Sequence, residues 1–182
     1  MEERTYSLST PLGAFRAVFT DAGLRSLSLP AFQSKIHRST APAAGRSTRL
    51  TAGNLKSKIE LNGHEGACGR KLSKALAARL AGRRVDLPWE LFDLHGRPPF
   101  FLRAWKALHA IPFGQVRTYA QIARAAGSPL ALRAAGQACG ANPIVLFIPC
   151  HRVVATGHPG GFGAGLAWKE RLLALEGISL FP

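Results

Sequence analysis

The run from Pro143 to Cys150, PIVLFIPC, constrains the fold more than any other stretch of the chain. Seven of its eight residues are hydrocarbon or proline, so the run has to be buried, and it predicts a buried strand that ends at an edge. It ends in a thiol that is followed at once by His151 and Arg152. A thiol in that position is either inert packing or a nucleophile, and other parts of the chain have to decide which.

The length and the apolar content favour a globular protein. The chain has 182 residues, 47% of them hydrophobic, which is enough for one large domain or two small ones with a real core. No apolar run reaches the roughly 18 residues that a membrane span needs. The opening MEERTYSLST has acids where a secretory signal has a basic region. We therefore expect a cytoplasmic protein.

The first half has an α plus β pattern. Residues 5–30 show short alternating runs separated by Pro-Leu-Gly and Asp-Ala-Gly, which predict a strand meander. Residues 31–55 lack periodicity and predict a long loop. Residues 70–82 place Leu72, Leu76 and Leu80 on one helical face, with Gly82 as the stop, and residues 85–94 predict a strand or an extended connector.

The second half is mostly helical in its pattern. In residues 98–114, Phe101, Trp105 and Leu108 share a face, and the helix should end at 111–114. A short helix should follow Thr118 as its N-cap, and another should follow Ser128, with Pro129 in its first turn and Gly140 near its end. This pair, joined by a tight turn, is compatible with a helix-turn-helix. Residues 165–177 predict a last amphipathic helix.

The charge points to a polyanionic partner. Twenty-four basic and ten acidic residues give a net charge of +14 and an isoelectric point near 11.1, which favours phosphate contacts. The predicted second helix of the pair is built mostly of Ala and Gly and has Arg133 as its one charge. Such a helix suits close approach to a narrow groove better than the reading of bases in the major groove, although a buried Ala/Gly helix with one surface Arg fits the pattern too.

The cysteines argue against disulfides and metal. Cys68, Cys139 and Cys150 are too few and too scattered for a disulfide framework. The nearest approach to a metal-binding pair is His64 with Cys68, and no second pair lies at a suitable spacing. We expect neither a metal nor any other cofactor.

The thiol of Cys150 needs a base or a positive field to react, because only the thiolate is nucleophilic. In an extended chain His151 would point to the opposite face, so it reaches the thiol only if the chain turns. A carboxylate could orient this histidine, and only Glu170 and Glu176 are available in residues 97–182. These residues alone leave nucleophile and packing about equally supported.

Several motifs together resemble the O6-alkylguanine-DNA alkyltransferases. The motifs are IPCHRVV, preceded by Asn142-Pro143, and the upstream stretches PFGQVRTYAQIA and SPLALRAAGQA. The likeness runs from roughly Phe100 to Gly177. A weaker likeness is visible near the N-terminus, in TPLGAFRAVFTDAGLRSLSLP. The resemblance implies an α+β protein. It would have a ribonuclease-H-like N-terminal domain (residues 1–92) and a C-terminal DNA-binding and alkyl-transfer domain (residues 93–182) with a helix-turn-helix and an active-site loop.

The resemblance also implies an activity: direct reversal of DNA damage. A monomer without a cofactor would bind double-stranded DNA through the minor groove and flip out the damaged base. It would then move the O6-alkyl group of guanine, and also the O4-alkyl group of thymine, irreversibly to Cys150, acting once. Such a protein would be cytoplasmic and associated with the nucleoid.

The family's roles transfer by position. His151, through a water held with Glu176, would deprotonate Cys150, and Asn142 would orient the thiol loop. Arg133 would fill the gap left by the flipped base, and Tyr119 would press on the rotating phosphate. The other DNA contacts would be Thr118, Ala131, Ala134 and Gly136, and the substrate pocket would hold Tyr119, Cys139, Val153, Phe162 and Gly163.

Two positions of the predicted substrate loop depart from the family pattern. Phe162 stands where a tyrosine is usual, which removes a hydroxyl donor to guanine, and Gly163 stands where many members have serine. Three alternatives remain: a lesion-binding protein that does not transfer the group, a DNA-binding regulator that senses alkylation or oxidation, and a Cys-His hydrolase. The cysteine argues against the first, the lack of a base-reading helix against the second, and the lack of a Gly-rich loop before Cys150 against the third.

Overall fold

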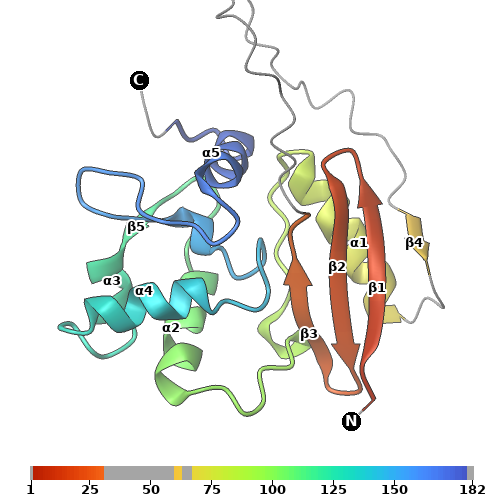
Figure 1. Ribbon diagram of the computed structural model, residues 1–182, viewed down its shortest axis with the longest axis horizontal. Coiled ribbons are helices and arrows are strands. Elements are labelled where there is room, and N and C mark those ends of the chain that lie inside the picture. Colours follow the sequence, from red (N-terminus) through yellow and green to blue (C-terminus); the bar gives the residue numbers. More distant parts are fainter. Residues whose placement is uncertain (1, 31–59, 63–66, 180–182) are drawn as a thin grey trace, which may run out of the picture.

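The computed structural model describes residues 2–30, 60–62 and 67–179, so the loop predicted at 31–55 lies outside the described residues. A four-stranded antiparallel sheet forms one side of the molecule, in the order β3-β2-β1-β4, and most helices lie on the other side (Figure 1). The α+β class is confirmed. The ribonuclease-H-like topology and the boundary between residues 92 and 93 stay predictions.

The predicted meander is confirmed. Strands β1 (Arg4–Thr10), β2 (Gly13–Thr20) and β3 (Gly23–Ser28) follow one another through tight turns, and β4 (Glu60–Asn62) pairs with β1. The turn glycines Gly13 and Gly23 have φ of 109° and 139°, a region that glycine enters without strain. Alternate side chains of these strands, among them Leu8, Phe15 and Leu27, are buried in the core.

Helix α1 (Ala67–Leu80) packs its predicted face on this sheet (Figure 1). Leu72, Leu76 and Leu80 are almost fully buried, and Gly82, with φ of 71°, ends the helix as expected. Residues 83–94 form the expected connector, which contains the short 3₁₀ helix η2 (Trp89–Leu91). The buried residues of the sheet, of α1 and of the C-terminal helices belong to one hydrophobic cluster.

Three of the predicted C-terminal helices lie close to their expected positions. Helix α2 (Pro99–His109) begins with proline in its first turn, and α5 (Leu166–Leu175) is the last helix. Helix α3 (Tyr119–Ala125) follows Thr118, which forms the predicted cap. Thr118 Oγ1 accepts a hydrogen bond from the backbone N–H of Gln121, and Gln121 Oε1 accepts one from the backbone N–H of Thr118. No helix of the described residues is long and apolar enough to cross a membrane.

The start predicted for the next helix is wrong. Helix α4 (Leu132–Gly140) begins after Ala131, three residues beyond the expected cap. Ser128 accepts a hydrogen bond from the Ala131 backbone, so residues 128–131 form a β-turn with Pro129 at its second position. The predicted end at Gly140 is confirmed.

The strand predicted for Pro143–Cys150 is also wrong. The run is buried, but it folds as consecutive turns in which Phe147 bonds to Val145 and Ile148 to Ile144, and Leu146 has a φ of 72°. Within the described residues its ladder-like contacts are with the edge of β3: Leu27 donates a backbone hydrogen bond to Pro143 and accepts one from Val145. Short local hydrogen bonds satisfy this backbone, so burial did not require a strand. The helix η3 (Cys150–Arg152) follows directly, and strand β6 (Val153–Val154) then pairs in parallel with β5 (Arg117–Thr118).

Candidate active site

Cys150 opens the η3 turn, and its thiol is held by Asn142. The residue is 6% exposed. Asn142 Nδ2 donates to Cys150 Sγ at 3.0 Å and to the Ile148 carbonyl at 2.6 Å, while its Oδ1 accepts from the Ile144 backbone. One amide therefore connects both ends of the buried loop and sets the position of the thiol.

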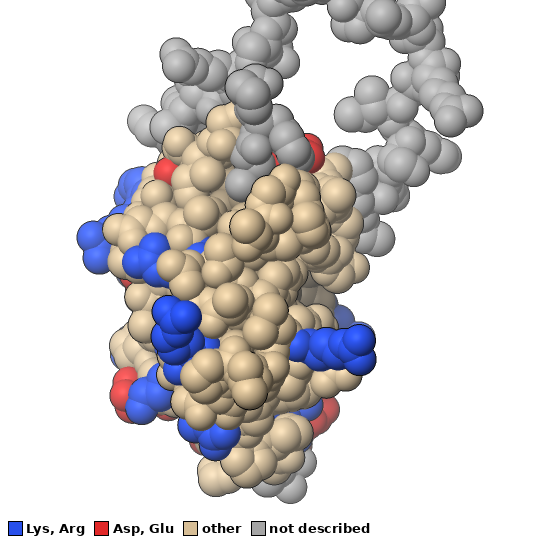
Figure 2. Space-filling model, turned by 90° about the vertical axis from the view of Figure 1, so that its left-hand side faces the viewer, with Lys and Arg blue, Asp and Glu red and all other residues tan. Residues whose placement is uncertain are grey.

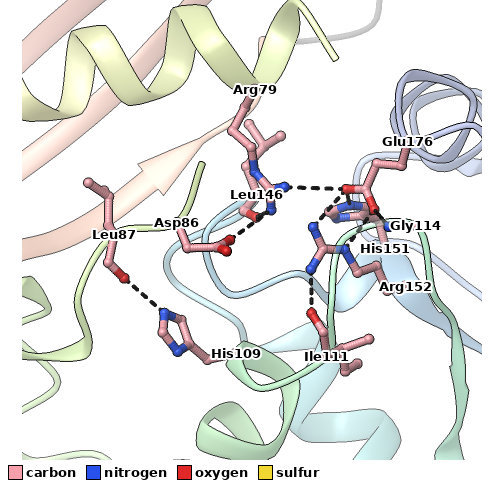
Figure 3. Close-up of polar contacts among 10 residues, drawn as sticks. All are labelled: Arg79, Asp86, Leu87, His109, Ile111, Gly114, Leu146, His151, Arg152 and Glu176. Atoms are coloured by element: carbon pink, nitrogen blue, oxygen red, sulfur yellow. Dashed lines mark hydrogen bonds and ion pairs between the residues drawn. The ribbon is translucent and has the colours of Figure 1, made fainter. Parts of the chain in front are cut away.

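His151 points away from the solvent and toward a carboxylate from the end of α5. Its Nε2 lies 3.0 Å from Glu176 Oε1, and both side chains are almost fully buried (Figure 3). Glu176 also accepts from Arg152 at 2.8 and 2.9 Å and from the Gly114 backbone at 3.2 Å. Of the two acids proposed from the sequence, the structure brings Glu176 to the histidine, whereas Glu170 is exposed.

The electrostatics of this group fix the tautomer of His151. Burial alone would raise the pKa of Glu176, but the hydrogen bonds from His151 and Arg152 outweigh it and hold the pKa at about 2. An ionised carboxylate only accepts hydrogen bonds, so Nε2 carries the ring proton. The other ring nitrogen, Nδ1, has no hydrogen-bond partner among the described residues. Burial lowers the pKa of His151, and the neutral ring is left with an unused lone pair on Nδ1.

The thiol is protonated at rest. Burial raises the pKa of Cys150, and the hydrogen bond from Asn142 and the charge of Lys169 only partly oppose that effect. Burial and the nearby Cys150 also raise the pKa of Cys139, to about 12. Cys150 differs from Cys139 in the hydrogen bond that its sulfur accepts from Asn142, which favours the thiolate.

A cavity of about 660 Å³ opens at Cys150. Cys139, Phe162 and Gly163 line it as predicted, together with Asn142. Two other residues predicted for the substrate pocket do not line the cavity: Val153, in β6, is fully buried, and Tyr119 packs against the backbone of the 159–161 loop, close to Gly160. The opposite wall comes from residues 26–30 at the end of β3, which the sequence did not assign to the site.

Lys169, like residues 26–30, belongs to the site although the sequence did not indicate it. It is fully buried, and its Nζ donates to the carbonyls of Val153, Pro159 and Gly161, so it ties together both ends of the loop beside the cavity. Burial lowers the pKa of Lys169, and the two nearby thiols oppose that effect. The sequence carries no clear signal for this role, because an isolated lysine in an amphipathic helix ordinarily indicates an exposed face.

The face of the molecule that carries α3 and α4 shows more basic than acidic side chains (Figure 2). Lys and Arg side chains surround a broad uncharged area on this face of the molecule, with few acids (Figure 2). Arg133 is exposed on α4, Ala131, Ala134 and Gly136 are half-buried, and a Cβ on Gly136 would meet no atom within 4 Å. Ala135 and Ala138, on the other side of the same helix, are buried. Leu130, in the turn before α4, is 97% exposed.

Nothing in the described part of the chain gathers three or more potential metal ligands. Cys68 is exposed, and its predicted neighbour His64 lies outside the described residues.

Comparison with known proteins agrees with this arrangement. A family profile described as the DNA-binding domain of 6-O-methylguanine DNA methyltransferase matches residues 99–178, which include Cys150, His151 and Glu176. A methylated-DNA–protein-cysteine methyltransferase of Methanosarcina acetivorans is 43% identical over 112 residues, 59% of this chain and 69% of that protein. The chain belongs to the methylated-DNA–protein-cysteine methyltransferase family.

Other members of the methyltransferase family extend the likeness. The enzyme of Mycolicibacterium paratuberculosis is 48% identical over 102 residues, and this chain spans 61% of its length. The crystal structure of Mycobacterium tuberculosis OGT in complex with DNA superimposes with a TM-score of 0.68 at 31% identity, covering 94% of this chain and 91% of that one. The O6-methylguanine-DNA methyltransferase of Pyrococcus kodakaraensis, 20% identical with a TM-score of 0.62, shares the fold.

Proposed function

We propose that this protein repairs alkylated DNA by moving the O6-alkyl group of guanine, and also the O4-alkyl group of thymine, to Cys150. The observation that carries the proposal is the thiol at the cavity, which Asn142 holds and which a buried histidine follows in the chain. The hydrogen bond of this histidine to Glu176 leaves its other ring nitrogen unprotonated. A thiol beside an oriented base is the arrangement that nucleophilic catalysis needs. No metal or cofactor is part of the proposed reaction.

The transfer is a displacement at the alkyl carbon. The sulfur of Cys150 forms a bond to that carbon while the bond from carbon to O6 breaks, and the base leaves as guanine. The thiol proton passes to Nδ1 of His151, directly or through one water, and the departing base takes up a proton. Glu176 stabilises the imidazolium that forms. The thioether is not cleaved again, so each molecule acts once.

The DNA would lie against α3 and α4, used as a helix-turn-helix in the minor groove. The small residues of α4 allow close approach of the helix, and Arg133 is exposed where it can replace a flipped base. Thr118 and Tyr119, at the start of α3, would contact the phosphate that rotates with that base. The basic face supplies attraction to phosphates without regard to sequence.

The flipped base would enter the cavity between Phe162 and the end of β3. Backbone amides near Gly163 would have to hold guanine, because Phe162 offers no hydroxyl. The protein would act as a monomer on double-stranded DNA in the cytoplasm, associated with the nucleoid, and its sheet would have the ribonuclease-H-like topology.

Repair stoichiometry tests the proposal. A duplex with one O6-methylguanine, in excess over protein, should be repaired to a plateau of one lesion per protein molecule, and Cys150→Ser should bind the duplex without repairing it. Continued turnover would indicate a hydrolase instead, and lesion binding without any repair would indicate a non-transferring lesion binder.

A further inference from the structure

Arg79 brings a charge from the N-terminal half of the chain into the active site. It lies in the last turn of α1, and its side chain is only 2% exposed. Its guanidinium points away from the sheet toward the loop and the carboxylate behind Cys150 (Figure 3). The other buried positions of α1 are apolar, so this one differs in kind from its neighbours.

The guanidinium contacts both parts of the catalytic arrangement. Its Nη2 donates to the Leu146 carbonyl at 3.2 Å, in the loop that leads to Cys150. Its Nη1 lies 3.8 Å from Glu176 Oε1, the oxygen that holds His151. The same guanidinium lies 5.3 Å from the centre of the Phe113 ring, which the Arg152 guanidinium also approaches, at 5.7 Å.

This burial is costly and incompletely compensated. Nε and Nη1 of Arg79 have no hydrogen-bond partner within the described residues, and the nearest acid besides Glu176 is Asp86, which is half exposed at 3.6 Å. A buried cation with unsatisfied donors destabilises a fold compared with an apolar side chain of similar size. Stability therefore does not explain an arginine at this position.

The charge balance around His151 suggests what the arginine does. Three charged groups face the histidine: Glu176 from the end of α5, Arg152 from η3 and Arg79 from α1, with Asp86 beside Arg79. Among the three groups that face the ring, one carboxylate stands against two guanidinium groups, a net charge of +1 before the ring takes up a proton. Asp86 neutralises that charge only from a distance, because it is half exposed and lies against Arg79. A protonated ring would add a third cation to the cluster.

We propose that Arg79 is a positioning residue for the transfer: it fixes Glu176 and the Leu146 carbonyl, and it keeps His151 neutral until the thiol gives up its proton. The proposal rests on the proposed function. The lowered pKa of His151 agrees with it, since burial is the largest cause and Arg152 and Arg79 both add to it.

The pH dependence of single-turnover transfer tests this role. Arg79→Met removes the charge, Arg79→Lys keeps it, and Lys74→Met removes an equal charge from the exposed side of the same helix. Arg79→Met should move the acid limb of the pH–rate profile upward by about half a pH unit or more, because the histidine loses a cationic neighbour. Arg79→Lys should keep the acid limb close to its wild-type pH, and Lys74→Met should leave the limb unchanged. A folded Arg79→Met protein with the wild-type limb would overturn the proposal, because loss of stability alone changes the active fraction and not the limb.

Alkylation of Cys150 by iodoacetamide, followed over pH without DNA, separates this inference from the proposed function. The wild type could fail to take an alkyl group from DNA while Arg79→Met still shifts the acid limb of the pH profile for iodoacetamide alkylation. That result would support the positioning role of Arg79 and refute the proposed repair function. If Arg79→Met does not fold, the Asp86→Asn variant tests the proposal instead. Loss of this anion should shift the acid limb of the pH–rate profile slightly to lower pH, and an unchanged limb would overturn the proposal.

Discussion

Replacing Glu176 by glutamine should destabilise the fold by about 3 kcal/mol. The carboxylate is 5% exposed and accepts from Arg152 and from the Gly114 backbone, so the substitution leaves buried cations without their counter-ion. Removing one partner of a buried ion pair costs about 3–5 kcal/mol. The pKa gives a similar figure: a fall from 4.5 to about 2 is worth about 3 kcal/mol at pH 7.

Urea unfolding at pH 7 measures this effect, with Glu170→Gln as the matched control. Glu170 lies on the same helix but is exposed, so its loss should change the free energy of unfolding by less than about 0.5 kcal/mol. A Glu176→Gln protein within 1 kcal/mol of wild type would refute the reasoning, as would equal losses in the two variants.

The pH dependence of the stabilisation by Glu176 follows from the direction in which folding changes its pKa. Because folding depresses the pKa of Glu176, the stabilisation is fully present above the unfolded value near 4.5 and is lost as the pH falls toward about 2. The gap in unfolding free energy between wild type and Glu176→Gln should therefore narrow below pH 4.5. A gap that stays constant down to pH 3 would contradict the assigned pKa.

Three further substitutions and one labelling experiment probe other parts of the site. Lys169→Met leaves three buried carbonyls without their donor and should lower the melting temperature, read by calorimetry, by about 5 °C or more; no change would mean that the lysine does not hold the loop. Arg133→Ala should slow transfer from duplex DNA at least about tenfold but leave the reaction with free O6-benzylguanine intact, and equal rates with duplex DNA would count against its role. Phe162→Tyr should tighten binding of free O6-alkylguanine in a competition assay, and unchanged binding would show that the hydroxyl is not needed. With a pKa of about 12, Cys139 should resist iodoacetamide at pH 8 in the native protein while exposed Cys68 is labelled, as peptide mass mapping would show; rapid labelling of Cys139 would contradict its burial.

The elements that the sequence predicted well are those whose signals are local. The meander, the leucine face of α1 and the Thr118 cap each depend on residues a few positions apart, and the structure confirms them. The start of α4 was misplaced because serine followed by proline is typical both of a helix start and of a β-turn. Only the hydrogen bond from Ala131 back to Ser128 distinguishes the two.

The buried run before Cys150 shows what hydrophobicity leaves open. Its burial was predicted, but its conformation depends on the side chain of Asn142, just before the run, and on the edge of β3, which is more than 100 residues away along the chain. Periodicity cannot distinguish a short buried strand from buried turns. The same turns remove the objection that His151 must point away from the thiol, because η3 is not extended.

The candidate site was predictable where a motif carries it. Cys150, His151 and Asn142 lie within ten residues, and Glu176 was one of only two acids available in its half of the chain. Lys169, Arg79 and the end of β3 could not be assigned in this way. They reach the site through tertiary packing, and an isolated lysine or arginine in a helix ordinarily indicates a solvent-exposed face.

Transfer of the alkyl group to Cys150 can be seen by intact-mass spectrometry after incubation with a duplex that carries one O6-methylguanine. We expect a single gain of about 14 Da, one methylene by formula, which peptide mapping places on Cys150 and which Cys150→Ser lacks. An unchanged mass in a protein that binds the lesion, or a gain on any other residue, would contradict transfer to Cys150.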